Sequence, residues 1–482
     1  MESALPNHPR AFGPSVGNRA PRRPARPRTG EPLSAALVLL GALWVMTILA
    51  PQWWLASHGL SPLLKLPLIL YGVMMVVLVV GVPTQPAWMR NWQWHAPFLL
   101  FIVLGALAIP FTVNNGVARE SLTQMFLYWL LIVATVALVP SVRRAEQLLL
   151  LFALQFVWWG FWGGTSGRVP WHTVWSNFDG FGAMMVGGLG LCHFFSLSSG
   201  RGWFRWTMYG SMLLCVFGVV ASFARGAFLG AIALFLVIWL RSPRKGRTLA
   251  TGLAVAVVMT AAAAALHPDT FVAEIRSTFT QGTSEGTGED RWTLWTAGMI
   301  VFSQHPIFGV GPNNFGPYAA DHFRYGEVGG MYDNPSRLYD RELHSAYVQF
   351  LSERGAVGFA IFLWILWDFW KRNAALRSNA ANERWRAQGG RLDLRMIALG
   401  LEANLVAFLV TAAVYSLIGS CWLYTVLALN LVLHSLAVRG AAVPGAVAPA
   451  RGPRLGRVVT PPRVAGAVSA PGGFARLRVP RS

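Results

Sequence analysis

Long apolar runs follow one another along the chain, with short polar breaks between most of them. A bilayer core about 30 Å thick requires roughly 20 apolar residues of helix, and this pattern predicts about twelve membrane-spanning helices. The predicted spans cover residues 33–50, 63–82, 97–113, 121–140, 147–163, 179–198, 207–222, 226–240, 248–266, 346–367, 396–417 and 421–438. The seventh and eighth meet almost without a loop, so the count becomes eleven if they form a single span.

Composition points to the same class of protein. Hydrophobic residues make up 54% of the 482 residues and charged residues only 12%, whereas a soluble domain carries about 25% charged residues. We therefore expect an all-α polytopic integral membrane protein surrounded by a lipid bilayer.

The chain is strongly basic, with 40 Lys and Arg against 20 Asp and Glu. In a soluble chain this excess would suggest a nucleic-acid partner, but in a membrane chain it usually records topology. Most of the basic residues fall in alternate loops on the side of the N-terminus. This predicts that both termini are cytoplasmic, and no nucleic-acid partner is expected.

The predicted spans divide the chain into five parts. Basic tails rich in Ala, Pro, Gly and Arg, residues 1–32 and 439–482, have a composition that cannot bury a core, so we expect disordered cytoplasmic tails. Spans 1–9 occupy residues 33–266, and spans 10–12 occupy 344–438. Between them lies a large external loop, 267–343, which holds ten of the twenty acidic residues. Structureless loops longer than about 15 residues are uncommon unless they are functional.

Three charged or titratable residues stand where they could serve chemistry. Arg225 lies at the outer end of two nearly continuous spans, Arg291 opens a helical stretch in the large loop, and His344 precedes the tenth span. Ionisable groups at a membrane are functional candidates. Each also has a plain alternative: a lipid-facing arginine that snorkels to headgroups, a surface arginine paired with Glu289 or Asp290, and an interfacial or helix-capping histidine.

These residues lie in motifs that resemble the O-antigen ligase and polymerase superfamily of bacterial envelope glycan enzymes. The likeness covers roughly residues 175–370, and the order of the motifs carries it. They are Ser222-Phe-Ala-Arg225-Gly226, Arg291-Trp-Thr-Leu-Trp295, His305-Pro with Gly309-Val-Gly311 and Phe315, and His344 with Tyr347, Glu353, Gly355 and Gly358. Many relatives have Ser directly before Arg, and Asn177-Phe-Asp179 matches only loosely, so Ser222 and Asn177 stay doubtful as site residues.

The resemblance implies an inverting, metal-independent glycosyltransferase of the bacterial inner membrane with a periplasmic active site. It would take a glycan from an undecaprenyl-pyrophosphate carrier and join it to an acceptor hydroxyl of a glycolipid such as lipid A-core. By motif position, His344 would be the catalytic histidine, and Arg225 and Arg291 would bind the donor pyrophosphate. No cofactor is implied.

Elementary chemistry agrees with these roles. Displacing pyrophosphate develops negative charge on the leaving group, which Mg²⁺ or the fork of Arg can stabilise. The first external loop, 51–61, has no acid, and the second has only Glu120, which favours arginine over a metal. Neutral imidazole, with an ordinary pKa near 6.5, can accept the proton of a sugar hydroxyl.

Further residues receive weaker assignments. Arg341 stands three residues before His344, on the same face if the segment is helical, and with Arg337 it could assist an anionic substrate. His322 could contact the acceptor, although a solvated loop face is the better interpretation, and His305 is expected to shape a turn. Other residues are expected to serve the packing of the protein. Glu353 would brace the loop, Glu402 would form a hydrogen bond between helices, and Gly355 and Gly358 would allow close helix packing. Cys192, Cys215 and Cys421 are expected to pack or to face lipid, without a disulfide or zinc site.

Several functions stay open on the sequence alone. The leading hypothesis is an O-antigen ligase-like glycan transferase, and its nearest rival is an O-antigen or exopolysaccharide polymerase of the same superfamily. A transferase acting on protein hydroxyls is a third member of that group. Two alternatives are not enzymes: a lipid-linked glycan flippase or other transporter, and a structural membrane scaffold. A transporter would show paired charges deep in several spans, whereas the deep charge here is nearly confined to Glu402.

Overall fold

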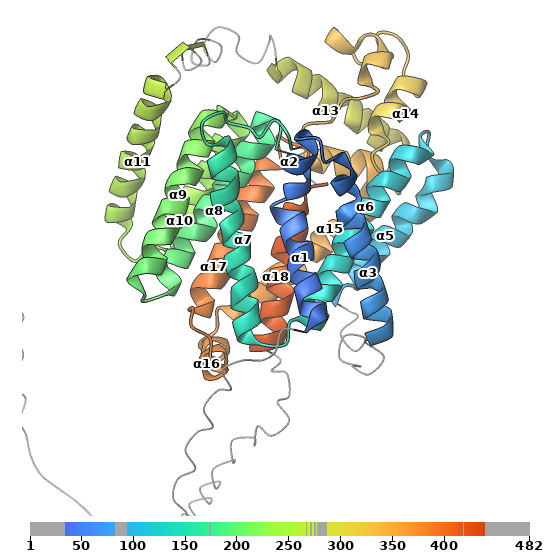
Figure 1. The fold of residues 1–482 in the computed structure, drawn as a ribbon. Coiled ribbons are helices and arrows are strands. Elements are labelled where there is room, and N and C mark those ends of the chain that lie inside the picture. The colour runs from blue at the N-terminus through green and yellow to red at the C-terminus, as the bar shows by residue number, and fades with distance from the viewer. Residues whose placement is uncertain are drawn as a thin grey trace, which may run out of the picture. The chain divides into compact units, whose positions relative to one another are not determined.

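The computed structural model describes residues 34–81, 94–172, 175–266, 287–417 and 419–438, together with 268, 269, 272, 273 and 276. Within this part of the chain every regular element is a helix, which confirms the all-α class (Figure 1). The predicted tails, 1–32 and 439–482, and much of the first third of the predicted large loop lie outside the described residues.

A helix coincides with each of the twelve predicted spans. They are α1 (Ala35–Ile48), α3 (Leu66–Gly81), α5 (Ala96–Ala108), α6 (Asn115–Leu138), α7 (Val142–Gly163), α8 (Phe178–Ser198), α9 (Gly202–Ser222), α10 (Arg225–Arg241), α11 (Lys245–Leu266), α15 (Ala346–Leu376), α17 (Leu394–Thr411) and α18 (Cys421–Ala437).

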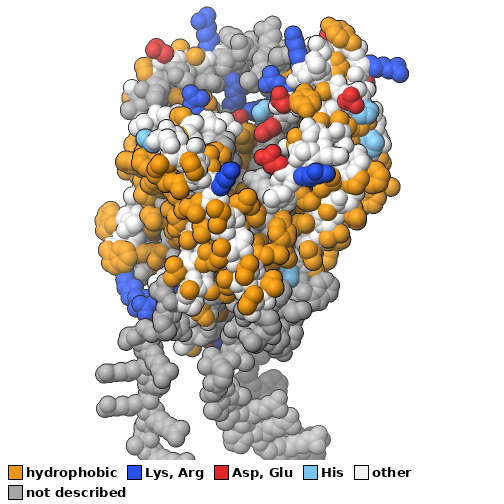
Figure 2. All heavy atoms as spheres, turned by 45° about the vertical axis from the view of Figure 1, so that its right-hand side comes forward, with side chains coloured by type: hydrophobic (Ala, Val, Ile, Leu, Met, Phe, Trp, Pro, Cys, Tyr) orange, Lys and Arg blue, Asp and Glu red, His pale blue; other side chains and the backbone are white. Residues whose placement is uncertain are grey.

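Not all of these helices are long and apolar enough to cross a membrane. Among the described residues, seven helices are long and apolar enough to cross a membrane, or eight if α1 and α2 (Pro51–Ser57), which are bent by 60° relative to each other, form one broken span. The protein is thus a multi-pass membrane protein, while the count of twelve spans stays a prediction. Hydrophobic side chains cover the middle of one face, and charged side chains and histidines gather above them (Figure 2).

Two helix boundaries differ from the predicted ones in ways that matter for function. Helix α6 begins at Asn115 rather than near 121, because the Asn114 side chain accepts a hydrogen bond from Val117 N and so caps a polar first turn. Helix α17 ends at Thr411 rather than at 417, and Ala412 O accepts a hydrogen bond from Ala346 N at the start of α15. The residues that follow form a tight segment, 412–417, which we term the 412–417 turn.

Helix α8 lies at the centre of the packing. It contacts α9, α10, α17 and α7, and most of its residues are buried. Three glycines make this possible, because a Cβ at Gly187, Gly188 or Gly190 would lie 2.2, 2.3 or 2.6 Å from the side chains of Trp422, Phe156 and Leu234, respectively.

Glu402 in α17 finds the partners that a buried acid requires. Its two carboxylate oxygens lie 2.6 Å from Arg241 Nη2 and 2.7 Å from Arg377 Nη1, and one also accepts from Asn373 Nδ2. The predicted interhelical bond is therefore confirmed, in the form of ion pairs that join α10 and α15 to α17. Of the cysteines, Cys192 and Cys215 are buried, Cys421 is half-buried, and all three thiols are free.

Helix α15 is interrupted at Gly355, where φ is 63° and ψ is −171°. Intact helix would bond Ala356 N to Ser352 O and Val357 N to Glu353 O. The chain after α13 (Thr287–Gln304), residues 306–311, satisfies all four of these groups instead.

The hydrogen bonds of this exchange are short and regular. Val310 N and Gly311 N donate to the carbonyls of Ser352 and Glu353 at 3.0 and 2.9 Å. Conversely, Ala356 N and Val357 N donate to Pro306 O and Ile307 O at 2.8 and 3.1 Å. We term this contact between residues 306–311 and 352–357 the backbone interlock.

Glycine is required on both sides of the backbone interlock. A Cβ at Gly309 would lie 2.3 Å from the carbonyl carbon of Glu353, and a Cβ at Gly355 would lie 2.3 Å from Ile307 O. The glycines of the two sequence motifs therefore serve the same contact, and Gly355 admits a loop at a break in the helix rather than the second helix expected from the sequence.

Replacing Gly355 with Ala should destabilise the protein. The substitution places a Cβ in a backbone region that is essentially restricted to glycine, which costs roughly 1–3 kcal/mol before the clash with Ile307 O is added. We expect a lower midpoint in thermal unfolding of the detergent-solubilised protein. Gly210→Ala is the matched control, because Gly210 lies within α9 and a Cβ there meets nothing within 4 Å. An equal midpoint for the two variants would contradict the role of the backbone interlock.

Candidate active site

His344 lies just before α15, in a backbone conformation with a positive φ of 47°. Ser345 caps the helix, and its hydroxyl accepts from Val348 N. Leu343 is buried in a small apolar core that the large loop forms with α13 and α14 (Phe315–His322). The imidazole is thus held between a capped helix and an anchored loop, and it is half-buried.

The ring of His344 lies beside Tyr415 of the 412–417 turn, with 6.2 Å between the ring centroids. Tyr415 is buried, and its hydroxyl accepts a hydrogen bond from Asn177 Nδ2. Burial raises the pKa of Tyr415 well above its ordinary value, so the phenol stays protonated at neutral pH. Asn177 also caps α8, since its Oδ1 accepts from Gly180 N at 2.7 Å. The start of α8 is therefore tied to the neighbour of His344.

Arg291 reaches the same end of α8. Its Nη2 lies 2.9 Å from Oδ2 of Asp179 in the first turn of that helix, and both side chains are about a quarter exposed. The sequence alternative, pairing with Glu289 or Asp290, involves side chains outside the described part of the structure. What the sequence did not reveal is the partner, which lies 112 residues away.

Arg225 is the first residue of α10. Gly226 packs against the 412–417 turn so closely that a Cβ there would lie 2.7 Å from Val414 Cγ2. Ser222 serves the junction of α9 and α10, where its hydroxyl donates to Val219 O and accepts from Ala224 N. Arg225 is an exposed residue.

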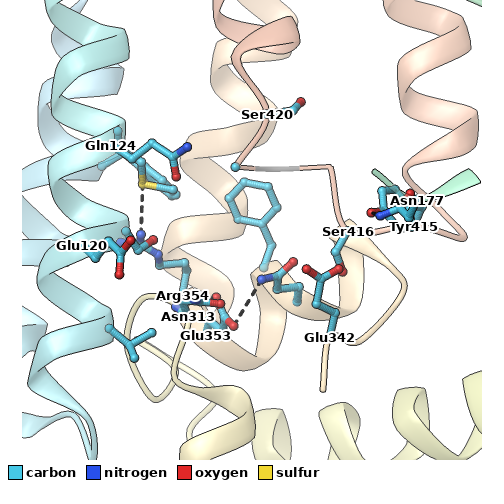
Figure 3. A pocket seen from close by; sticks show the side chains of 17 residues that line it. Glu120, Gln124, Asn177, Asn313, Glu342, Glu353, Arg354, Tyr415, Ser416 and Ser420 are labelled. Atoms are coloured by element: carbon cyan, nitrogen blue, oxygen red, sulfur yellow. Dashed lines mark hydrogen bonds between the residues drawn. The ribbon is translucent and has the colours of Figure 1, made fainter. Parts of the chain in front are cut away.

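A cavity of about 350 Å³ opens beside Tyr415 (Figure 3). Its walls come from α5, the first turns of α6, the segment before α8, the glycine loop after α13, the start of α15 and the residues that follow α17. The lining residues are Phe101, Val117, Glu120, Ser121, Gln124, Met125, Asn177, Asn313, Glu342, Gln349, Phe350, Glu353, Arg354, Tyr415, Ser416, Gly419 and Ser420.

Glu353 and Arg354 fix the inner wall of this cavity. Glu353 Oε2 accepts from Asn313 N at 2.9 Å, and Oε1 accepts from Gln349 Nε2 at 3.3 Å. The expectation that Glu353 braces the loop is therefore confirmed. Arg354 lies over the ring of Phe101, 4.6 Å from its centroid, and directs Nη2 to Met125 Sδ.

Residues 210–363 match the family model described as O-antigen ligase. This segment is thus similar to the O-antigen ligase family. The resemblance drawn from the motifs is thereby confirmed for this segment, which contains Arg225, Arg291 and His344. A search of curated proteins found no match.

The matched segment does not contain the whole site. Asn177, Asp179 and Tyr415 lie outside the matched segment, yet they contact the site or its predicted residues. Asn before an apolar run is a typical helix-capping signal, and this signal could have located Asn177 at the start of α8. By contrast, nothing in the local pattern of Tyr415 indicates that the 412–417 turn lies against His344, because the contact joins segments that are far apart in the chain.

Three predicted substrate-contacting residues lie away from the lining of the cavity. Arg337 is exposed in the short helix η5 (Pro335–Leu338), and His322 stacks on Tyr318 at the end of α14, with 4.2 Å between ring centroids. Arg341 is exposed in a non-helical segment. The helical pairing of Arg341 with His344 is therefore wrong, since Leu338 ends η5 and the next helix begins only at Ala346.

His305 behaves as expected for a residue that shapes a turn. Its Nε2 is hydrogen-bonded to Tyr318 OH at 2.9 Å, which ties the end of α13 to α14. Among the described residues, no three His, Cys, Asp or Glu side chains converge on a point that could hold a metal ion. The described contacts bring together the imidazole of His344, the phenol of Tyr415 and a cavity rich in hydrogen-bonding groups, and they tie Arg291 to the first turn of α8.

Replacing Glu353 with Ala should loosen the glycine loop. The change removes the acceptor of Asn313 N, and a hydrogen bond to a charged group contributes about 1.5–3 kcal/mol. We expect amide hydrogen exchange in residues 306–318 to be faster by roughly tenfold or more, as a change above 1.4 kcal/mol implies.

The matched variant Glu353→Gln keeps a carbonyl oxygen in place. It should therefore show a smaller increase in exchange than Glu353→Ala. Unchanged exchange in both variants would mean that the loop does not depend on this side chain.

Proposed function

We propose that the protein transfers a glycan from undecaprenyl-pyrophosphate to an acceptor hydroxyl, such as a sugar of lipid A-core, on the periplasmic side of the bacterial inner membrane. The match of residues 210–363 to the O-antigen ligase family supports a membrane glycosyltransferase of the ligase or polymerase type. The observation that carries the proposal is that His344 of this segment lies beside the 412–417 turn. The same turn contacts the first residues of α10 and the cap of α8.

Arg225 and Arg291 would bind the pyrophosphate of the donor. Arg291 uses one edge of its guanidinium for Asp179, and a guanidinium has five N–H donors in a planar fork. The remaining donors suit phosphate oxygens, and the ion pair would hold the fork in one orientation. Fixed cations at the leaving group stabilise the negative charge that develops as the bond to the sugar breaks.

His344 would act as the general base. The acceptor hydroxyl attacks the anomeric carbon of the donor sugar, and its proton passes to the imidazole. A new glycosidic C–O bond forms while the C–O bond to the pyrophosphate breaks, and the electron pair leaves with the carrier pyrophosphate. Attack from the face opposite the leaving group inverts the anomeric configuration.

The first test is transfer in vitro by purified protein in the presence of EDTA. The donor is an undecaprenyl-pyrophosphate-linked oligosaccharide, and the acceptor is either lipid A-core or a second lipid-linked glycan. We expect transfer to lipid A-core that survives EDTA, because arginines take the place of a metal. General-base catalysis contributes about 10²–10⁴-fold, so His344→Ala should lose transfer by that order, and Arg291→Ala should also be strongly impaired.

Controls separate these losses from general damage. His58→Ala and Arg384→Ala make the same changes at exposed positions outside the proposed site, and both should retain transfer. Growth of the lipid-linked acceptor alone would make the protein a polymerase. Absence of transfer, with His344→Ala and Arg291→Ala still complementing a deletion strain, would refute the enzyme and favour a lipid-linked glycan transporter.

A second prediction concerns Asp179 as a positioning residue. Asp179→Asn keeps the size of the side chain but removes the charge that orients Arg291, and loss of such a charge-assisted bond is worth about 1.5–3 kcal/mol. We expect transfer to fall by roughly tenfold, mainly through a higher KM for the donor. In an Arg291→Ala background, Asp179→Asn should have no further effect. Additive losses would show that Asp179 acts through some other group.

A further inference from the structure

More acidic than basic side chains line the cavity beside Tyr415. Three carboxylates line it, those of Glu120, Glu342 and Glu353, against the single guanidinium of Arg354. Most of the remaining lining side chains are amides and hydroxyls. Neither Arg225 nor Arg291, the arginines of the proposed donor site, is among the lining residues.

The inner pair of charges is engaged in part, since Nη1 of Arg354 is buried without a hydrogen-bond partner among the described residues. Glu353 receives hydrogen bonds from the backbone of Asn313 and from Gln349. Arg354 is buried, and its guanidinium is directed to Phe101 and to Met125 Sδ. These two residues therefore form a fixed wall.

The outer carboxylates face the cavity from different elements. Glu120 belongs to α6, and Glu342 comes from the segment that leads to His344 (Figure 3). Within the described residues, neither forms an ion pair. Glu120 and Glu342 are both solvent-exposed residues, and partial desolvation at the cavity raises the pKa of Glu342 above its ordinary value. Acidic side chains gather in a hollow above the hydrophobic middle of this face (Figure 2).

This lining fits one chemical class of ligand. Sugar hydroxyls donate to carboxylates and exchange hydrogen bonds with amides such as Gln124 and Gln349, and the ring of Phe350 offers an apolar face. A volume of about 350 Å³ lies at the lower end of the range of small-molecule sites, which suits a short saccharide. A phosphate or carboxylate on that sugar would meet Glu120 and Glu342, and like charges placed together repel each other.

We propose that this cavity is the acceptor-saccharide subsite, and that Glu120 and Glu342 restrict it to sugars without an anionic substituent. The inference rests on the proposed function, since it names the acceptor class of that same site. Charge would then keep the two substrates apart, with the anionic donor group at the arginines and the neutral acceptor sugar among the carboxylates.

A protection assay tests the cavity without any transfer reaction. Ser121→Cys introduces a thiol of nearly the same shape into the lining, and maleimide labelling is followed in the purified protein. The parent protein reports the background from Cys192, Cys215 and Cys421. The ligands are octyl β-glucoside and its 6-phosphate, which share one anchor, each below its critical micelle concentration.

Octyl β-glucoside should slow labelling of the introduced thiol, while the 6-phosphate should require a concentration roughly tenfold higher for the same protection, because of like-charge repulsion. Adding Glu120→Gln and Glu342→Gln together should bring the two concentrations to within about twofold. Glu383→Gln, the same change on α16 (Asn379–Ala387) at the other end of the bundle (Figure 1), should preserve the difference. Equal protection by both ligands without the Gln changes, or by neither, would overturn the inference.

Transfer kinetics separate this inference from the proposed function. With a matched pair of neutral and phosphorylated acceptors, we expect the double Gln variant to lower KM for the phosphorylated acceptor by roughly tenfold relative to the neutral one. Transfer by the wild-type protein without any such charge preference would refute the subsite and leave the glycosyltransferase intact. Charge-selective protection without any transfer would support the cavity while the proposed reaction fails.

Discussion

The break in α15 at Gly355 is the constraint on which the rest of the site depends. Four backbone groups lose their helical partners there, and each unsatisfied buried group would cost about 1–3 kcal/mol. Residues 306–311 satisfy all four, so the large loop and the helix form one unit rather than a lid on a bundle. The same contact directs Glu353 towards Asn313 N, and it thereby fixes both the glycine loop and the inner wall of the cavity.

A second constraint arises where α17 ends early. The 412–417 turn places Tyr415 between His344 and Asn177, and it packs Val414 against the start of α10. The groups proposed for catalysis thus stand at or just before the ends of helices, which hold side chains more firmly than free loops do. Arg291 pairs with Asp179 at the start of α8, while the side chains of Glu120, Glu342 and Glu353 line the cavity.

Much of this architecture follows from the sequence. Each apolar run that predicted a membrane span coincides with a helix, and the ordered motifs lie mostly in the segment that matches the O-antigen ligase family. Other features lie beyond local pattern. The partner of Arg291 is 112 residues away, and the cavity joins segments from Phe101 to Ser420, so no periodicity reveals either. The segment that contains Arg341 is not helical, so the condition under which Arg341 would share a face with His344 is not met. Apolarity alone also misplaced the start of α6, whose first turns are polar and line the cavity.

The central claim is that His344, Arg225 and Arg291 serve one reaction centre beside the carboxylate-lined cavity. A cryo-EM structure of the His344→Ala protein in nanodiscs, with an undecaprenyl-pyrophosphate-linked oligosaccharide bound, tests it most directly. We predict density for the pyrophosphate between Arg225 and Arg291, with the first sugar directed towards position 344. Pyrophosphate bound elsewhere, for instance at the arginines around Glu402 near the opposite end of the helices, would contradict it.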